Sequence, residues 1–314
     1  MDKPLIVISD GFDEKIFNDL ESTPELNIFP EKKVSREKLI ELGDKINGLI
    51  IRSATTVDQE LINYLPNLKL VIRAGEGTDN IDKSYCKDKS IKVANTPGAN
   101  SNSAAEHAIA LMMTVLRKTH KAHASMAEGK WEKQLFAGNE LWKKSVGFVG
   151  FGRIGKIVAK RISGFEPQIS FYDPFIESDI EPNYKKKTLE DLFSNCDIIS
   201  VHTPLSEQTK NLVDEKLISL MRKDSVLINA ARGGVVNETH LINALKNNSI
   251  RGAALDVFET EPLSNDSELL SLDNVLLTPH LGASTAEAQV RVGLMAASQV
   301  KEFFINQNLI NEVK

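Results

Sequence analysis

The sequence has little of several features that define large protein classes. Only two cysteines, Cys86 and Cys196, occur among 314 residues, which is too few for a disulfide framework and suggests inert thiols in a reducing cytoplasm. No apolar run reaches the roughly 18 residues of a membrane span, and the amino-terminal run MDKPLIVISD has no cleavable signal pattern. The net charge of −5 argues against a nucleic acid or an anionic membrane as the main partner. We therefore expect a cytoplasmic globular protein, in which an anionic small substrate would need a local basic cluster.

What is present predicts the fold class. Short β-branched runs alternate with helical stretches, and many of the runs are apolar at consecutive positions, which is typical of parallel strands buried on both faces. Ten runs are predicted as strands: Leu5–Ile8, Leu49–Ile51, Leu68–Ile72, Ile91–Val93, Val146–Val149, Ile169–Tyr172, Ile198–Val201, Val226–Ile228, Gly252–Leu255 and Val275–Leu277. The alternation predicts an α/β fold of doubly wound parallel sheets, and the restart at residue 146 predicts two sheets rather than one.

The two sheets are not expected to form consecutive domains. Capping boxes at Ser103 with Glu106, and at Ser284 with Glu287, predict the starts of a long helix and of the last helix. The last helix runs to about residue 306 and follows the final strand of the second sheet, so it could cross back to the first domain. We therefore place one domain at 1–99 and 285–314, and the other at 100–284.

A glycine-rich turn opens the second domain. Gly150, Gly152 and Gly155 form G-x-G-x-x-G directly after a strand and directly before the helical run Ile154–Arg161. In that context the glycines allow a tight turn, a close approach to a pyrophosphate and a helix–strand contact. Eighteen residues past Gly155, Asp173 ends the next strand, where an acid can bind both ribose hydroxyls of NAD and would repel the extra phosphate of NADP. The alternative is a set of turn glycines with a helix-capping Asp; we expect a Rossmann domain that binds NAD.

Further motifs carry a resemblance over essentially the whole chain. They occur in the order IRSATTV, RAGEGTDNID, NTPGANSNSAAE, GKWE, GFGRIG, FYDP, VHTPL, NAARGGVVNE, GAALDVFETEP and PHLGAST. The chain thereby resembles the D-isomer-specific 2-hydroxyacid dehydrogenases, and among them most closely the D-3-phosphoglycerate dehydrogenases. The resemblance implies a flavodoxin-like substrate domain (1–99 and 285–314), an inserted Rossmann NAD-binding domain (100–284), an active site in the cleft between them, and a homodimer built largely through the nucleotide domain.

Oxidation of an alcohol beside a carboxylate needs a cation, a base and a partner for that base. Arg232 follows the strand Val226–Ile228 and presents a fork that matches a carboxylate, and Gly233 and Gly234 are expected to leave room for a ligand. Taken alone, one Arg after a strand is more often part of a surface ion pair. The resemblance implies that Arg232 orients the substrate.

The base is chosen by the resemblance rather than by position. The chain has six histidines, and position favours His280 in TPHLGAST only weakly; His107 is expected to serve packing or to face solvent. Residue chemistry likewise does not separate Glu259 from Glu261 as the partner acid. The resemblance implies that His280 is the proton donor and acceptor, and that Glu261, directly before a proline, is its partner.

The resemblance also implies cofactor and substrate contacts. It places Asp256 near the nicotinamide amide and implies further cofactor contacts at Arg153, Ile154, Thr203, Ala230, Gly282 and Ala283. Arg52 with Ser53, and Arg73, follow two strands of the first domain and match arginines that bind a phosphorylated substrate, while Lys133 matches a basic residue supplied by the neighbouring subunit. One position departs from the family pattern, because Glu76 stands where the family has Thr. A carboxylate there could repel an anionic substrate or engage Arg52 or Arg73.

We therefore expect NAD-dependent oxidation of 3-phospho-D-glycerate to 3-phosphooxypyruvate, the first step of L-serine biosynthesis. Alternatives are a hydroxypyruvate or glyoxylate reductase, another D-2-hydroxyacid dehydrogenase such as one for D-lactate, and, more distantly, an NAD-sensing scaffold like the corepressors that resemble this family. No cluster has metal-ligand spacing, so no metal is expected. Because the chain ends at Lys314, soon after the last predicted helix, we expect no regulatory domain and no inhibition by L-serine.

Overall fold

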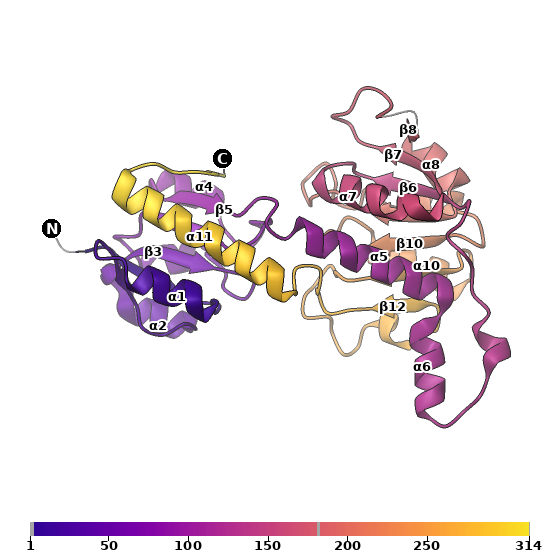
Figure 1. Cartoon of the computed structure of the whole chain (residues 1–314), viewed down its shortest axis with the longest axis horizontal. Coiled ribbons are helices and arrows are strands. Elements are labelled where there is room, and N and C mark those ends of the chain that lie inside the picture. Colours follow the sequence, from indigo (N-terminus) through magenta and orange to yellow (C-terminus); the bar gives the residue numbers. More distant parts are fainter. Residues whose placement is uncertain (1–2, 181–182, 314) are drawn as a thin grey trace. The chain divides into compact units, whose positions relative to one another are not determined.

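The chain divides into two compact units in a computed structural model that describes residues 3–180 and 183–313 (Figure 1). The first unit comprises residues 1–100 and 283–314, and the second comprises residues 101–282. The predicted boundaries, 1–99 with 285–314 and 100–284, differ from this division by one or two residues. The substrate-binding role given to the first unit remains a prediction.

The first unit is a five-stranded parallel sheet with helices around it. The strands lie in the order β2-β1-β3-β4-β5, which is the flavodoxin order. Their bounds are β1 Leu5–Ile8, β2 Asn27–Ile28, β3 Ile46–Ile51, β4 Leu70–Arg73 and β5 Lys92–Asn95. The helices are α1 Glu14–Glu21, α2 Arg36–Leu42, α3 Gln59–Asn63, α4 Lys83–Asp88 and α11 Ala286–Asn306, with a 3₁₀ turn at Gly43–Lys45. Alternate strand residues enter two apolar clusters, one on each face of the sheet.

The second unit is a seven-stranded parallel sheet in the order β12-β11-β10-β9-β6-β7-β8. This is the Rossmann order with one strand added beyond the sixth. The strands are β6 Ser145–Val149, β7 Gln168–Tyr172, β8 Tyr184–Lys186, β9 Ile198–Val201, β10 Val226–Asn229, β11 Gly252–Leu255 and β12 Val275–Leu277. The helices are α5 Ser101–Arg117, α6 Thr119–Ala127, α7 Arg153–Ile162, α8 Leu189–Asn195, α9 Glu215–Leu220 and α10 Glu238–Lys246, with 3₁₀ turns at Lys133–Phe136, Ser163–Phe165 and Glu268–Ser271. The predicted α/β class with two doubly wound parallel sheets is confirmed.

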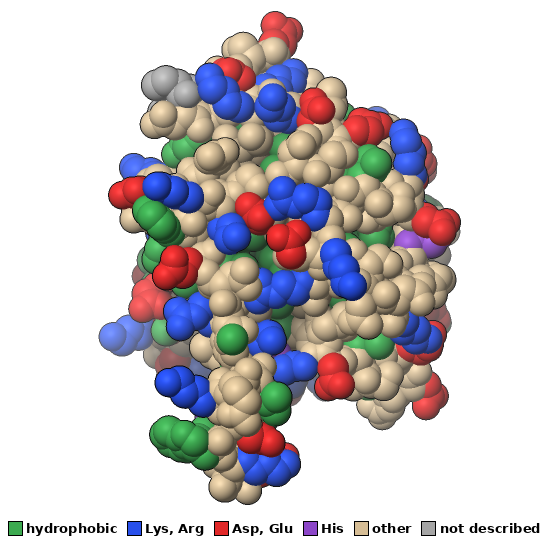
Figure 2. All heavy atoms as spheres, turned by 90° about the vertical axis from the view of Figure 1, so that its right-hand side faces the viewer, with side chains coloured by type: hydrophobic (Ala, Val, Ile, Leu, Met, Phe, Trp, Pro, Cys, Tyr) green, Lys and Arg blue, Asp and Glu red, His purple; other side chains and the backbone are tan. Residues whose placement is uncertain are grey.

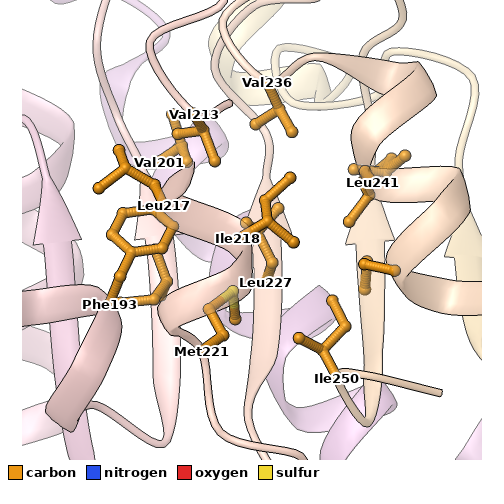
Figure 3. Packing of buried hydrophobic residues seen from close by; sticks show 14 of the residues in the cluster. Phe193, Val201, Val213, Leu217, Ile218, Met221, Leu227, Val236, Leu241 and Ile250 are labelled. Carbon is orange, nitrogen blue, oxygen red and sulfur yellow. The ribbon is translucent and has the colours of Figure 1, made fainter. Parts of the chain in front are cut away.

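Apolar side chains pack on both faces of the second sheet. On one face Phe193 from α8 and Leu217 from α9 pack with Val201 and Leu227 of the central strands (Figure 3). On the other face residues of α5 and α7, such as Leu111, pack in a second cluster. Each fully buried side chain of this size contributes about 1.5–3 kcal/mol. The strand ends that carry the predicted site residues therefore project from a well-packed framework.

Several predicted elements need correction. The strands β2 and β8 were not predicted, because runs of two and three residues carry no periodic signal. Both predicted capping boxes are wrong. Ser103 lies inside α5, which begins at Ser101, and α11 is capped by Thr285, whose side chain accepts the Ala288 N–H, rather than by Ser284.

The surface of the second unit includes a projecting arm. α6 extends away from the body of this unit, and the segment that follows it carries Trp131, which is 79% exposed (Figure 1). On the face drawn in Figure 2, Lys and Arg side chains lie among Asp and Glu side chains. Across 3–180 and 183–313, no helix combines the length and apolar character needed to cross a bilayer.

Candidate active site

Apart from Lys133, the predicted site residues of the second unit follow the carboxyl ends of its strands. Parallel strands place these ends at one edge of a sheet, which is where ligands bind in such folds. The positions are Gly150 after β6, Asp173 after β7, Thr203 after β9, Ala230 and Arg232 after β10, Asp256 and Glu261 after β11, and His280 and Gly282 after β12. Ala283 follows Gly282 directly and begins the return of the chain to the first unit.

The glycine turn has the geometry that its sequence predicted. Gly150 has φ +89°, and a Cβ there would lie 2.8 Å from the carbonyl oxygen of His202. A Cβ at Gly155 would lie 2.8 Å from the carbonyl oxygen of Gly150, so the start of α7 packs directly on the turn. Gly152 is different, because a Cβ there would meet nothing within 4 Å. Among the described residues no side chain caps α7 at Gly152, and a pyrophosphate could therefore approach the helix start that Arg153 and Ile154 begin.

Two further groups fit a dinucleotide. The buried Asp173 carboxylate accepts the Phe151 N–H on Oδ2 and the Phe175 N–H on Oδ1, both at 2.9 Å. These bonds hold the acid beside the glycine turn. Thr203 Oγ1 is buried and has no hydrogen-bond partner among the described residues. The neighbouring His202 bonds Ser200, stacks on Phe148, and has its pKa lowered to about 4 by burial.

Arg232 is presented by a tight turn that Asn229 builds. The buried Asn229 side chain accepts the Ala231 N–H at 3.1 Å and donates to the Arg232 carbonyl at 3.0 Å. The guanidinium in turn donates from Nη1 to the Ala231 carbonyl at 2.7 Å. The prediction that Gly233 leaves room for a ligand is wrong, because a Cβ there would overlap the Phe258 carbonyl. The space at Gly233 is filled by the segment that leads to Glu261, and this close approach brings the Arg232 turn against it.

His280 and Glu261 are in contact. The distance from His280 Nδ1 to Glu261 Oε2 is 2.6 Å, and the other Glu261 oxygen accepts the Phe258 N–H at 3.1 Å. Burial raises the pKa of Glu261, but the hydrogen bonds from His280 and from the Phe258 N–H outweigh it, so the pKa lies below its ordinary value. An ionised carboxylate accepts, so Nδ1 carries a proton, and in the neutral ring the lone pair then lies on Nε2. The ring is therefore in the tautomer that a base acting through Nε2 requires.

Asp256 holds the loop that carries His280. Its buried carboxylate accepts the Leu281 N–H at 2.8 Å, the Gly282 N–H at 2.9 Å and the Thr278 hydroxyl at 2.6 Å. His107 Nε2 lies 3.0 Å from the same carboxylate. The acid predicted to face the nicotinamide thus has four partners within the protein, and that predicted role remains a prediction.

In the first unit, the two predicted arginines lie at neighbouring strand ends. Ile51 of β3 pairs with Arg73 of β4, and Arg52 follows directly after Ile51. Burial lowers the pKa of Arg52, while the charge of Asp10 opposes that shift. The Arg73 guanidinium lies against Gly75, where a Cβ would overlap it, and it donates to the Ala74 carbonyl at 3.1 Å. Two cations therefore share one edge of this sheet, as the sequence predicted from their strand-end positions.

The loop that carries Arg52 and the exposed Ser53 is held from two sides. Asp10, after β1, accepts the Arg52 N–H at 2.6 Å and both the N–H (3.0 Å) and the hydroxyl (2.6 Å) of Thr55. Asn80 donates to the carbonyls of Arg52 and Thr55 at 2.7 and 2.6 Å. Neither Asp10 nor Asn80 was predicted as a site residue.

Glu76 and Lys133 lie in different settings. The Glu76 carboxylate accepts the Gly98 N–H at 2.6 Å, so the family departure ties its loop to the segment after β5. Lys133 is exposed and begins the 3₁₀ turn at the end of the arm. No three His, Cys, Asp or Glu side chains gather into a metal site in the part of the chain that the structure describes.

The residues that hold the loops of the candidate site share a sequence feature that predicts this role only weakly. Asp10, Asn229 and Asp256 each come within two residues of the end of a predicted strand, where a polar side chain can bond the next loop. His107 offered no such signal, because it lies on a helix 149 residues from Asp256 in the chain.

A comparison with known families places the chain. A model described as the NAD-binding domain of the D-isomer specific 2-hydroxyacid dehydrogenases matches residues 109–282, more than half of the chain. The chain belongs to this family. The family and NAD as its cofactor, both predicted from the motifs, are confirmed.

Relatives within the family differ in their names and lengths. The chain is 43% identical over 269 residues to a D-3-phosphoglycerate dehydrogenase of Archaeoglobus fulgidus, with 85% of this chain and 51% of that protein covered. It is 41% identical over 296 residues to a hydroxypyruvate reductase of Thermotoga maritima, with 93% and 96% covered. This family member therefore spans about half the length of the first relative and nearly all of the second.

A solved structure shares the whole fold. The NAD-dependent formate dehydrogenase of Staphylococcus aureus in complex with NAD superposes with a TM-score of 0.87, at 28% identity, and covers 100% of this chain and 99% of that one. The two-sheet architecture is thus that of a solved NAD complex.

Proposed function

We propose that this protein is an NAD-dependent dehydrogenase that oxidises 3-phospho-D-glycerate to 3-phosphooxypyruvate, the first step toward L-serine. The choice of a phosphorylated substrate is carried by Arg52 and Arg73, which sit at neighbouring strand ends of one sheet. Two cations at one edge suit a phosphate better than either arginine does singly. The name of the Archaeoglobus fulgidus relative supports the same substrate.

Side chains of the protein bind the substrate and take up the proton that its hydroxyl releases. Arg232 binds the carboxylate of the substrate through its planar fork and so aligns the neighbouring carbon. His280 takes the proton of the C2 hydroxyl on Nε2, because Nδ1 is occupied by Glu261 at 2.6 Å. Glu261 then stabilises the imidazolium that forms. NAD⁺, when bound, accepts the hydride from C2, so the alcohol becomes a ketone with release of one proton.

The cofactor site is proposed at the glycine turn. The open side of Gly152 and the start of α7 suit the pyrophosphate, and the buried Thr203 hydroxyl has an unused hydrogen-bonding capacity. Asp173 would bind the ribose hydroxyls and repel the phosphate of NADP by on the order of a few kcal/mol. The ratio of kcat/KM with NAD to that with NADP should therefore exceed about 100. Equal efficiencies with the two cofactors would remove Asp173 from this role.

The test of the substrate is a panel of initial rates. NADH formation is followed with 3-phospho-D-glycerate, D-glycerate, D-lactate and glycolate, and NADH consumption with hydroxypyruvate and glyoxylate. We expect kcat/KM for 3-phospho-D-glycerate to exceed that for D-glycerate at least about tenfold, the equivalent of one charge-assisted hydrogen bond. A preference for an unphosphorylated substrate would overturn the proposal.

A second candidate is a hydroxypyruvate or glyoxylate reductase. It is favoured by the Thermotoga maritima relative, of which this chain covers 96%. The same Arg232, Glu261 and His280 would serve it, with the proton running in the opposite direction. Highest efficiency with hydroxypyruvate in the panel would select this candidate. Binding of NAD with no turnover of any compound would instead favour an NAD-sensing scaffold.

We also propose a cytoplasmic homodimer. The arm made of α6 and the segment that follows it exposes Met126, Trp131 and Leu135, a set of apolar side chains that suits burial against a second copy. Lys133 in the same segment would then reach the partner's substrate. Sedimentation of wild type and of Trp131→Ser tests the dimer, which should weaken in the variant.

The two cysteines are free and buried, and burial raises the pKa of Cys86 to about 11 and that of Cys196 to about 12, as expected for inert thiols.

A further inference from the structure

The loop from Thr278 to Gly282 holds His280 in an uncommon backbone conformation. His280 has φ +54°, in the left-handed region that few residues other than glycine adopt. Its N–H is shared between the carbonyls of Asp256 at 2.9 Å and Thr278 at 3.0 Å. Such a conformation persists only where the surroundings restrain it. The groups that restrain this loop therefore decide where the His280 imidazole lies.

One face of α5 supplies part of that restraint. Ser103 and His107 are four residues apart, so they share a face of the helix. Ser103 Oγ donates to the carbonyl of Gly282 at 2.7 Å. His107 Nε2 lies 3.0 Å from Asp256 Oδ1 and 3.2 Å from Thr278 Oγ1. α5 thus contacts the loop at its beginning, at its end and at the carboxylate that gathers it.

The direction of the His107 contact follows from its partner. Asp256 already accepts two backbone N–H groups and the Thr278 hydroxyl, as an ionised carboxylate does. Only a donor can therefore face Oδ1, so His107 Nε2 carries its proton toward Asp256. The His107 side chain is 19% exposed and that of Asp256 is 1% exposed, so water has little access to replace this bond.

We propose that His107 is a positioning residue for His280. By donating to Asp256, it fixes the carboxylate in the orientation that holds the loop, and the loop in turn keeps His280 Nδ1 on Glu261. This inference rests on the proposed function, in which His280 is the base. His107 contacts no reacting group in this scheme; it acts through Asp256 and the loop.

The test compares two substitutions of similar size. In His107→Gln the side-chain amide can still donate to Asp256, whereas in His107→Met it cannot. We expect kcat to fall at least tenfold in the Met variant and to stay within about threefold of wild type in the Gln variant, with KM and the dissociation constant of NAD nearly unchanged in both. The primary isotope effect with 2-deuterated substrate should rise in the Met variant, because the chemical step becomes slower. His123→Gln, on the exposed side of α6, is the control and should behave as wild type.

A structural readout separates this inference from the proposed function. In ¹⁵N-histidine-labelled wild type, the proton between His280 Nδ1 and Glu261 should give a downfield resonance that His280→Gln lacks. It should persist in His107→Gln and broaden or disappear in His107→Met. If the wild type turns over no 2-hydroxy acid but these spectra hold, the proposed function fails and the positioning role stands. Equal kcat and equal spectra in the Gln and Met variants, both folded by circular dichroism, would overturn the positioning role. If the Met variant does not fold, a His107→Gln variant with wild-type thermal stability but at least tenfold lower kcat would overturn it instead.

Discussion

In each unit an aspartate holds a loop by accepting its backbone N–H groups, and the restraint is tighter in the second unit. In the first unit Asp10 accepts the backbone N–H groups of Arg52 and Thr55, and in the second Asp256 accepts those of Leu281 and Gly282. Both acids come within two residues of the end of a strand, and both hold a loop that follows another strand. The Asp10 site is only partly buried, whereas Asp256 is fully buried.

The difference matches what each loop must present. In the proposed mechanism the Arg52 loop offers a long cation that can meet a ligand over a range of positions, and ordinary backbone restraint is enough. The His280 loop must hold a ring against Glu261 at 2.6 Å in a left-handed backbone conformation. A proton transfer depends on position far more steeply than a charge–charge attraction does, so the tighter restraint lies at the residue that takes the proton in the proposed mechanism.

The largest expected effect is at the base itself. His280→Ala should cut turnover by roughly 10²–10⁴, because proton transfer from the substrate then has no positioned acceptor. NAD binding, measured by fluorescence quenching, should be nearly intact. Arg52→Ala is the contrasting variant, and we expect it to act mainly through KM. Wild-type turnover in His280→Ala at its optimal pH would show that the base is elsewhere.

The two aspartates should differ in their contribution to stability. Asp256→Ala leaves the buried Gly282 N–H and the partly buried Leu281 N–H and Thr278 hydroxyl without their acceptor, and since a buried donor left unpaired costs about 1–3 kcal/mol, we expect a loss of about 3 kcal/mol. Asp10→Ala should cost about 1 kcal/mol, because water can reach its partners and replace the lost bonds. Guanidinium unfolding followed by circular dichroism measures both. Equal midpoints in the two variants would erase the proposed contrast between the loops.

A smaller effect should single out the phosphate. Arg73→Ala should raise KM for 3-phospho-D-glycerate about tenfold more than KM for D-glycerate, since one charge-assisted hydrogen bond contributes roughly 1.5–3 kcal/mol. Lys69→Ala, at a position one residue before β4, provides a cation-removing control. An equal rise for both substrates would mean that Arg73 serves the fold of its loop rather than the ligand.

The smallest expected effect is a change in pH dependence. Burial raises the pKa of Asp256, but the hydrogen bonds from His107, Thr278 and Leu281 outweigh it and bring the pKa below the ordinary value. Because the folded pKa is lower than the unfolded one, this carboxylate contributes stability above about pH 4, and the contribution disappears as the pH falls through the folded pKa. Unfolding midpoints of the wild type should therefore fall more steeply below pH 4 than those of Asp256→Asn. Parallel pH profiles of the unfolding midpoints in wild type and Asp256→Asn would contradict a lowered pKa of Asp256.

Much of this architecture could be predicted from the sequence. All ten predicted strands are present, because buried parallel strands leave continuous apolar runs that local patterning detects. The contact between His280 and Glu261 was expected from family motifs and lies within 19 residues. The contacts that the sequence did not predict join residues that lie far apart in the chain. Thr55 is 45 residues from Asp10, and His107 was expected to serve packing or to face solvent. Ser103 was mistaken for a helix cap because its true partner, the Gly282 carbonyl, is 179 residues away.

The return of the chain to the first unit has a consequence for how the protein is made. α11 supplies Val292, Ala296 and Val300 to an apolar cluster of the first unit, and its Gln299 donates to the Asn95 carbonyl at 2.8 Å. These residues emerge from the exit tunnel of the ribosome only after every strand of the second unit has emerged. The unit whose synthesis begins first is therefore the last to complete its core. Until α11 packs, the apolar face that it covers is exposed and can bind chaperones that act on nascent chains.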